Sequence, residues 1–173
     1  MGNRGLTFLE ILITLIIFTI AMLGFFRVFN VALIAQQRAR QEVIAINLAR
    51  GLAAEAMSKN FTDPVDGETG ALGPNSGESL SNRQTFDDVD DYNGYSDSPP
   101  VTLGGQAMNV AGGLDYSGFS RSVNVVYCNV IGNYINCPVA TPPLPDYKRA
   151  RVTVNSPYAK NIVIDEVKGK PVP

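Results

Sequence analysis

The chain has no histidine and no tryptophan, and only two of its 173 residues are cysteine. Without histidine, neither a Ser-His-Asp or Cys-His nucleophile system nor an imidazole metal site can form. Two cysteines are too few for a zinc site built from four thiolates. Paired carboxylates remain chemically able to act as acid and base, but nothing in the sequence indicates a substrate pocket beside them. We therefore expect a protein that is not an enzyme and has no catalytic residues.

A surplus of basic residues is also missing. The chain has 14 lysines and arginines against 16 aspartates and glutamates, which gives a formal net charge of −2. A protein that binds nucleic acid neutralises a phosphate backbone with lysine and arginine. We therefore expect no nucleic-acid partner.

Charge is missing altogether from one apolar run, because residues 11–26 include no charged side chain. About 20 apolar residues are enough for a helix to cross a bilayer, and residues 6–26 reach that length. Glu10 lies inside this run, five residues after Gly5. A carboxylate near the end of such a helix costs roughly 3 kcal/mol on insertion scales. Glu10 therefore requires a cationic partner.

Residues 4–10, with the apolar run behind them, resemble the N-terminal signature of type IV prepilins and pseudopilins. In that family a membrane peptidase cleaves after the glycine of a short basic leader, and the new first residue is N-methylated. The resemblance implies a leader at residues 1–5, cleavage between Gly5 and Leu6, and N-methylation of Leu6. It also implies that Glu10, fifth in the mature chain, pairs with the N-terminal ammonium of a neighbouring subunit. An α-amine has a pKa near 8, so this pair would neutralise two charges in lipid. The alternative is a plain signal anchor with a fortuitous glutamate.

Two stretches resemble subgroups of that family. Residues 20–24 are similar to modification-type minor pilins and to the equivalent minor pseudopilins of type II secretion, and residues 86–94 to the D minor pilin of mannose-sensitive hemagglutinin pili. The resemblance implies a minor pilin that primes or joins assembly of a type IV pilus through its hydrophobic helix. The alternatives are a minor pseudopilin of a type II secretion system and a pilus-tip adhesin.

The same resemblance implies where the protein acts and with what. Its partners would be other pilin subunits, contacted by helix packing, the prepilin peptidase, the inner membrane and the pilus assembly machinery. The chain would cross the inner membrane once, with its head in the periplasm, before it enters a cell-surface pilus or a periplasmic pseudopilus.

The pattern of residues predicts an α+β fold of the type IV pilin kind. No proline occurs in residues 6–59, which indicates one long helix, apolar and transmembrane over 6–26 and amphipathic over 27–59. Residues 60–118 read as an irregular connection, with one short helix over 86–92 capped by Thr85. Residues 119–173 read as a small antiparallel sheet laid on the helix. Its strands are expected at 122–127, 133–137, 148–154 and 161–167.

The helix is expected to present one stripe spaced by three or four residues. Its outer half would pack on the sheet, whereas its inner half would contact other helices in a filament. The stripe consists of Val28, Ala32, Ala35, Ala39, Val43, Ile46, Ala49, Ala53 and Met57, widened by Leu48 and Leu52.

The two cysteines flank Gly132 and Asn133. With these two residues as a hairpin loop, Cys128 lies opposite Cys137 at a pair where the side chains approach closely. This register predicts a Cys128–Cys137 disulfide, which fits an oxidising compartment. Two free buried thiols are the alternative.

Asp87, Asp88, Asp90 and Asp91 form an acidic stretch. Their spacing does not match an EF-hand loop, although they remain possible oxygen ligands of a looser calcium site. The expected arrangement is a surface helix with solvated carboxylates, and no other metal or cofactor is expected.

Overall fold

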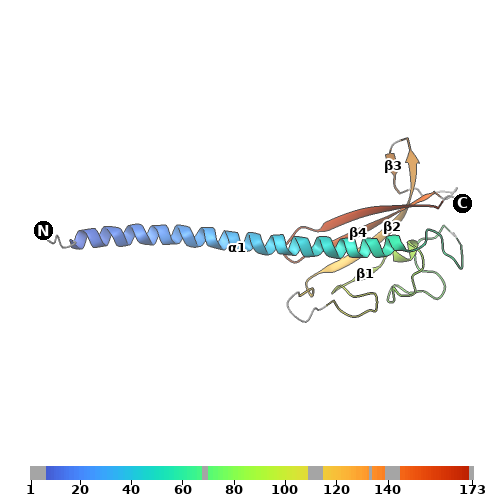
Figure 1. Ribbon diagram of the computed structural model, residues 1–173, viewed down its shortest axis with the longest axis horizontal. Helices are drawn as coiled ribbons and strands as arrows, with labels where there is room; N and C mark the ends of the chain where they lie inside the picture. The colour runs from blue at the N-terminus through green and yellow to red at the C-terminus, as the bar shows by residue number, and fades with distance from the viewer. Residues whose placement is uncertain (1–6, 68–69, 109–114, 133, 139–144, 172–173) are drawn as a thin grey trace. The chain divides into compact units, whose positions relative to one another are not determined.

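A computed structural model describes residues 7–67, 70–108, 115–132, 134–138 and 145–171. The predicted cleavage and methylation residues, Gly5 and Leu6, lie outside this part of the chain. Figure 1 shows the elements in order: the helix α1 (Phe8–Ser58), the 3₁₀ helix η1 (Asp90–Tyr92), and the strands β1 (Ser96–Asp97), β2 (Ser120–Ile131), β3 (Tyr134–Asn136), β4 (Tyr147–Asn155) and β5 (Ile162–Gly169). One long helix and a small antiparallel sheet confirm the α+β class.

The chain divides into two compact units within α1, Met1–Arg40 and Gln41–Pro173. The described part of the first unit is helical from Phe8 onward, and every residue from 7 to 40 is exposed. The second unit, which we call the head, contains the last part of α1, the connecting region and the sheet. The hydrophobic core is therefore confined to the head.

Residues 41–58 of α1 bury one face in the head. The buried side chains recur every three or four residues, as expected for a helix packed on one side: Ala45, Leu48, Ala49, Leu52, Ala53 and Ala56. Four of the six are alanines, which let the helix approach the sheet closely. The predicted stripe was correct at Leu48, Ala49, Leu52 and Ala53 but wrong at Val43, which is 58% exposed.

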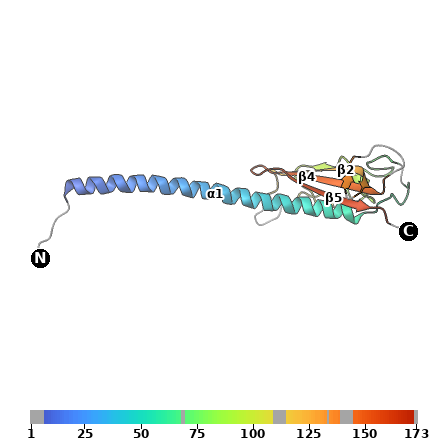
Figure 2. The ribbon, with the colours of Figure 1, turned by 90° about the horizontal axis from the view of Figure 1, so that it is seen from above.

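The sheet has the strand order β1-β2-β4-β5, and every pairing is antiparallel. Figure 2 shows β4 and β5 lying alongside the end of α1. On β4 the buried side chains alternate with more exposed ones, as in a sheet with one face on the core: Lys148, Ala150, Val152 and Val154. One of these four inward positions thus holds a lysine instead of an apolar residue.

The β2–β3 hairpin has the predicted register, with Asn129 opposite Asn136 and Ile131 opposite Tyr134. Gly132 has a φ of +62°, a left-handed conformation that glycine adopts without a steric penalty. The register places Cys128 beside Cys137, and the predicted disulfide is present with the two Cα atoms 4.5 Å apart.

The prediction of a short helix over residues 86–92 is wrong in its length, because only η1 is helical there. The backbone of this segment pairs with the residue two positions beyond α1. Asn60 donates its N–H to the carbonyl of Asp87 at 3.1 Å, and its own carbonyl accepts the N–H of Val89 at 3.1 Å. Thr85 does not cap a helix, because its hydroxyl donates to the carbonyl of Asn82. The two backbone bonds with Asn60 thus take the place of hydrogen bonds within a helix.

Removal of the disulfide should destabilise the head. The bridge joins residues nine positions apart. Closing a loop of about this size stabilises a fold by about 2–3 kcal/mol, because it lowers the conformational entropy of the unfolded chain. The Cys128→Ala/Cys137→Ala variant should lose about this much free energy of unfolding in denaturant titrations of the full-length chain in detergent. Dithiothreitol should destabilise the wild type by a similar amount and leave the variant unchanged. A wild type that is insensitive to full reduction would contradict this prediction.

Candidate functional site

The first unit presents an apolar surface that no described part of the chain covers. Phe8, Phe18, Leu23 and Val28 are 65–81% exposed. The helix is long and apolar enough to cross a membrane, and its most apolar window, of mean hydropathy 2.5, is 0% buried. Soluble monomers rarely expose contiguous apolar patches this large. A surface of this kind is suited to contact with lipid or with other protein chains.

Glu10 lies in the first turn of α1 and is exposed. Its N–H donates to the carbonyl of Thr7 at 3.0 Å, and its side chain forms no ion pair within the described residues. The positive end of the helix dipole stabilises such a carboxylate by only about 0.3–1 kcal/mol. This stabilisation offsets a minor part of the roughly 3 kcal/mol that a membrane position costs. No cation among the described residues offsets the remainder.

The acidic stretch is not a solvated surface helix, and that prediction is wrong. Asp88, Asp90 and Asp91 are 1%, 4% and 0% exposed, while Asp87 is half-buried. The structure separates the four carboxylates into two groups. Asp88 and Asp90 face a buried lysine, whereas Asp87 and Asp91 lie near Glu78.

The buried lysine is Lys148, which the sequence pattern did not single out. Its ammonium donates to Oδ1 of Asp90 at 2.5 Å and to the carbonyl of Phe61 at 2.5 Å. Oδ2 of Asp88 lies 3.9 Å away, and the rings of Phe61 and Tyr127 lie 4.7 and 5.6 Å from the ammonium. The only signal in the sequence was its place in the alternation of β4, where an apolar residue belongs. Lys148 thus joins the sheet, the connecting region and the segment that follows α1.

Asp88 and Asp90 share this one lysine. Oδ1 of Asp88 accepts the N–H groups of Asp90 at 2.8 Å and Asp91 at 3.2 Å. Burial, followed by the hydrogen bond and charge of Asp90, raises the pKa of Asp88 to about 8. Near neutral pH, Asp88 therefore holds its proton much of the time, and Lys148 pairs chiefly with Asp90.

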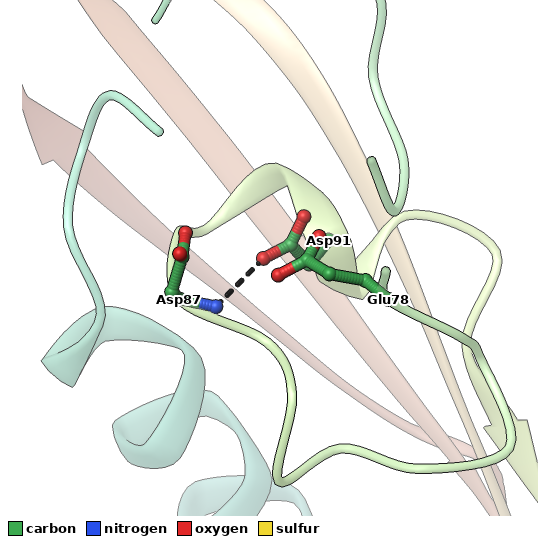
Figure 3. A group of neighbouring side chains, drawn as sticks. All are labelled: Glu78, Asp87 and Asp91. Atoms are coloured by element: carbon green, nitrogen blue, oxygen red, sulfur yellow. Dashed lines mark hydrogen bonds between the residues drawn. The ribbon is translucent and has the colours of Figure 1, made fainter. Parts of the chain in front are cut away.

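Glu78, Asp87 and Asp91 form the second group, shown in Figure 3. One oxygen from each carboxylate lies within 4.8 Å of the others. Oδ2 of Asp91 accepts the N–H groups of Asp87 at 2.9 Å and Asp88 at 3.0 Å, and Oε2 of Glu78 accepts the N–H of Asn75 at 2.9 Å. Burial raises the pKa of Glu78 to about 7, against the Asn75 bond and with a further contribution from Asp91.

Two further ion pairs brace the head. Arg121 donates to both oxygens of Asp97, and the carboxylate also accepts the N–H of Val101 at 2.9 Å. Glu55 of α1 lies 3.3 Å from Arg83 and accepts the hydroxyl of Tyr92 at 2.9 Å. These contacts fix the connecting region against α1 and β2 and need no ligand.

The arrangement as a whole suits packing and binding. No family model, no curated protein and no solved structure matches the chain. The features that call for something outside the described chain are the apolar surface with Glu10 and the group formed by Glu78, Asp87 and Asp91.

Removal of the Lys148 charge should be strongly destabilising. Lys148→Met would leave Asp90 buried without its cation, and breaking a buried pair in this way costs about 3–5 kcal/mol. The matched control on the same strand is Arg151→Met, because Arg151 pairs with Asp165 at side chains that are 43% and 37% exposed. The control should lose less than about 1 kcal/mol. Equal losses of unfolding free energy in the two variants would contradict the assignment of Lys148.

The head should become less stable as the pH rises from 5 to 8. The folded pKa values of Glu78 and Asp88, about 7 and about 8, exceed their ordinary values of 4.5 and 3.8. Their contribution to stability is therefore full below about pH 4 and is lost as the pH rises through the folded values. Asp97 has a lowered pKa, so its contribution is lost only in stronger acid.

Denaturant titrations without divalent ions should show a loss of at least about 1 kcal/mol over this range, the value of one pKa unit. Asp88→Asn should flatten the profile. A stability that increases with pH over the same range would contradict the burial of protonated carboxyl groups.

Proposed function

We propose that the protein is a structural subunit of a type IV pilus, a minor pilin that primes or joins filament assembly through its N-terminal helix. The observation that carries this proposal is Glu10, the one acidic residue in the exposed apolar part of α1 between residues 7 and 26. A membrane anchor alone has no use for a carboxylate there. A subunit that must find its register among other helices does.

Assembly would use two forces. Packing of apolar helices against one another would cover the surface that the first unit exposes. The N-terminal ammonium of a neighbouring subunit, created by cleavage after Gly5 and methylated on Leu6, would neutralise Glu10. A helix shifted along its neighbour would leave both charges unpaired in an apolar surrounding, at roughly 3 kcal/mol for a carboxylate. The ion pair would thereby select one axial position.

The head fits a location outside the cytoplasm, since the Cys128–Cys137 disulfide is typical of oxidising compartments. The subunit would first span the inner membrane with its head in the periplasm. The same properties would serve a minor pseudopilin of a type II secretion system, whose filament stays in the periplasm.

A second candidate function, binding at the pilus tip, is favoured by the β2–β3 hairpin. Tyr134, Ile131 and Ile135 are 80%, 63% and 52% exposed, and the disulfide holds the base of the hairpin. A rigid apolar tip is a suitable contact surface for a partner protein or a glycan. Cells should bind the wild-type subunit and lose binding with Ile131→Ser/Tyr134→Ser if this function applies.

The assembly proposal predicts the N-terminus of the protein in filaments. In a host with a working prepilin peptidase, sheared surface filaments should contain a chain that begins at N-methylated Leu6, as determined by intact mass and N-terminal sequencing. Glu10→Gln should be cleaved normally yet enter filaments at least about tenfold less, because a free-energy difference of 1.4 kcal/mol already gives a factor of ten and the neighbouring ammonium would lose its partner.

Glu42→Gln is the matched control, since Glu42 is an exposed glutamate farther along the same helix, and it should assemble like the wild type. Filaments recovered only from the periplasm would favour the pseudopilin alternative. A chain that still begins at Met1, or normal assembly of Glu10→Gln, would refute the proposal.

A further inference from the structure

Asp91 carries a carboxyl oxygen that is fully buried and accepts no hydrogen bond from an N–H or hydroxyl group of the described residues. The residue is 0% exposed. Its Oδ2 accepts two backbone N–H groups, whereas Oδ1 is enclosed and meets no hydrogen-bond donor among the described residues. Oδ1 of Asp87 is enclosed and unpartnered in the same way. A buried carboxylate oxygen without a donor or cation is costly, so these two atoms need an explanation.

The charges around these oxygens make the cost larger. Glu78 brings a third carboxylate within 4.8 Å, and the charges of Asp63 and Asp66 also act on Asp87. None of the three clustered carboxylates forms an ion pair with a lysine or arginine in the described chain. Lys59 attracts Asp87 from farther away, and its ammonium donates to the carbonyl of Phe86 at 2.6 Å. The group therefore brings three carboxyl groups together without an ion pair to a lysine or arginine of the described residues.

The geometry suits one metal ion. Ligand oxygens of a calcium ion lie at about 2.3–2.6 Å, so two of them are at most about 5 Å apart. The oxygens of Glu78, Asp87 and Asp91 meet this limit, because they lie within 4.8 Å of one another. Figure 3 shows the side chains of Glu78 and Asp91 directed toward one another, with Asp87 beside them. The donors are oxygens alone, with no imidazole or thiolate, which favours a hard cation.

We propose that Glu78, Asp87 and Asp91 bind one calcium ion, which joins the loop that carries Glu78 to the segment that begins η1. Water would complete the coordination, since the protein supplies three carboxylates. This ligand set differs from the one predicted from the sequence, because Asp88 and Asp90 are engaged with Lys148 and Glu78 was not predicted. A site with few protein ligands binds weakly, with dissociation constants of about 10⁻⁴–10⁻³ M in extracellular modules.

Calcium titration of the full-length chain in detergent, after removal of metals with EDTA, tests the site. Calorimetry should detect one ion per chain with a dissociation constant of about 10⁻⁴–10⁻³ M, and calcium should raise the midpoint of thermal unfolding. Glu78→Gln should weaken calcium binding at least about tenfold, because affinity follows the number of charged ligands. In EDTA the same variant should unfold at a higher temperature than the wild type, since it removes repulsion among the carboxylates.

Glu166→Gln, which neutralises an exposed glutamate on β5, should bind calcium like the wild type. Asp87→Asn gives a second test at a half-buried ligand and should also weaken binding. Circular dichroism checks that each variant is folded. The proposal fails if the wild type shows no calcium response, if Glu78→Gln responds as strongly as the wild type, or if magnesium is as effective as calcium. None of these outcomes depends on filament assembly.

Discussion

The order of the head depends most on the contacts that the ammonium of Lys148 makes. It donates to Asp90 and to the carbonyl of Phe61. It thereby joins β4 to the connecting region and to the segment that follows α1. The described residues between α1 and β2 form only η1 and β1 as regular elements, so repetitive backbone hydrogen bonds hold little of this region. The hydrogen bonds of the buried Lys148 ammonium constrain the backbone of this region instead. Aromatic rings of Phe61 and Tyr127 exclude water from the ammonium and strengthen the electrostatic interaction.

Buried ion pairs are expensive, and apolar residues of similar volume often stabilise a core equally well. The benefit here lies in specificity. The connecting region is rich in glycine, serine and aspartate, and Phe86, Val89, Tyr92 and Tyr95 are its fully buried apolar side chains in the core. The bonds from Lys148 to Asp90 and to the carbonyl of Phe61 restrict the backbone of this region, and the Arg121–Asp97 and Arg83–Glu55 pairs restrict it at other points. The charged contacts thus add geometric constraints to those of the apolar core.

The sequence pattern correctly predicted the elements whose structure depends on residues close together in the chain. The Gly132 turn determines the register of the β2–β3 hairpin, and with it the disulfide, without reference to the rest of the fold. The acidic stretch was predicted wrongly because the partner of Asp90 lies 58 residues away, and polarity alone does not distinguish a solvated carboxylate from a buried one. The stripe on α1 shows the same limit. Alanines occur on several faces of the helix, so their spacing could not decide between Val43, which is exposed, and Ala45, which is buried. Glu78 was missed because nothing in the sequence links it to residues 87–91.

The carboxylates of the chain differ in whether a cation or a hydrogen-bond donor lies beside them. Within the head, Asp88, Asp90 and Asp97 each meet a cation or backbone N–H groups close by, so folding alone accounts for their burial. Glu10 has no cation in the described chain, and the apolar side chains around it have no cover. Asp87 and Asp91 each retain an enclosed oxygen with no donor. The described residues leave carboxyl groups without a cation or donor at two separate places, and the two places differ in their surroundings. Beside Glu10, the charge and the long apolar surface lie together, and the proposed contact with a neighbouring helix and its ammonium would cover both. Beside Asp91, carboxylate oxygens of three residues lie within 4.8 Å of one another, and the proposed calcium ion would join them.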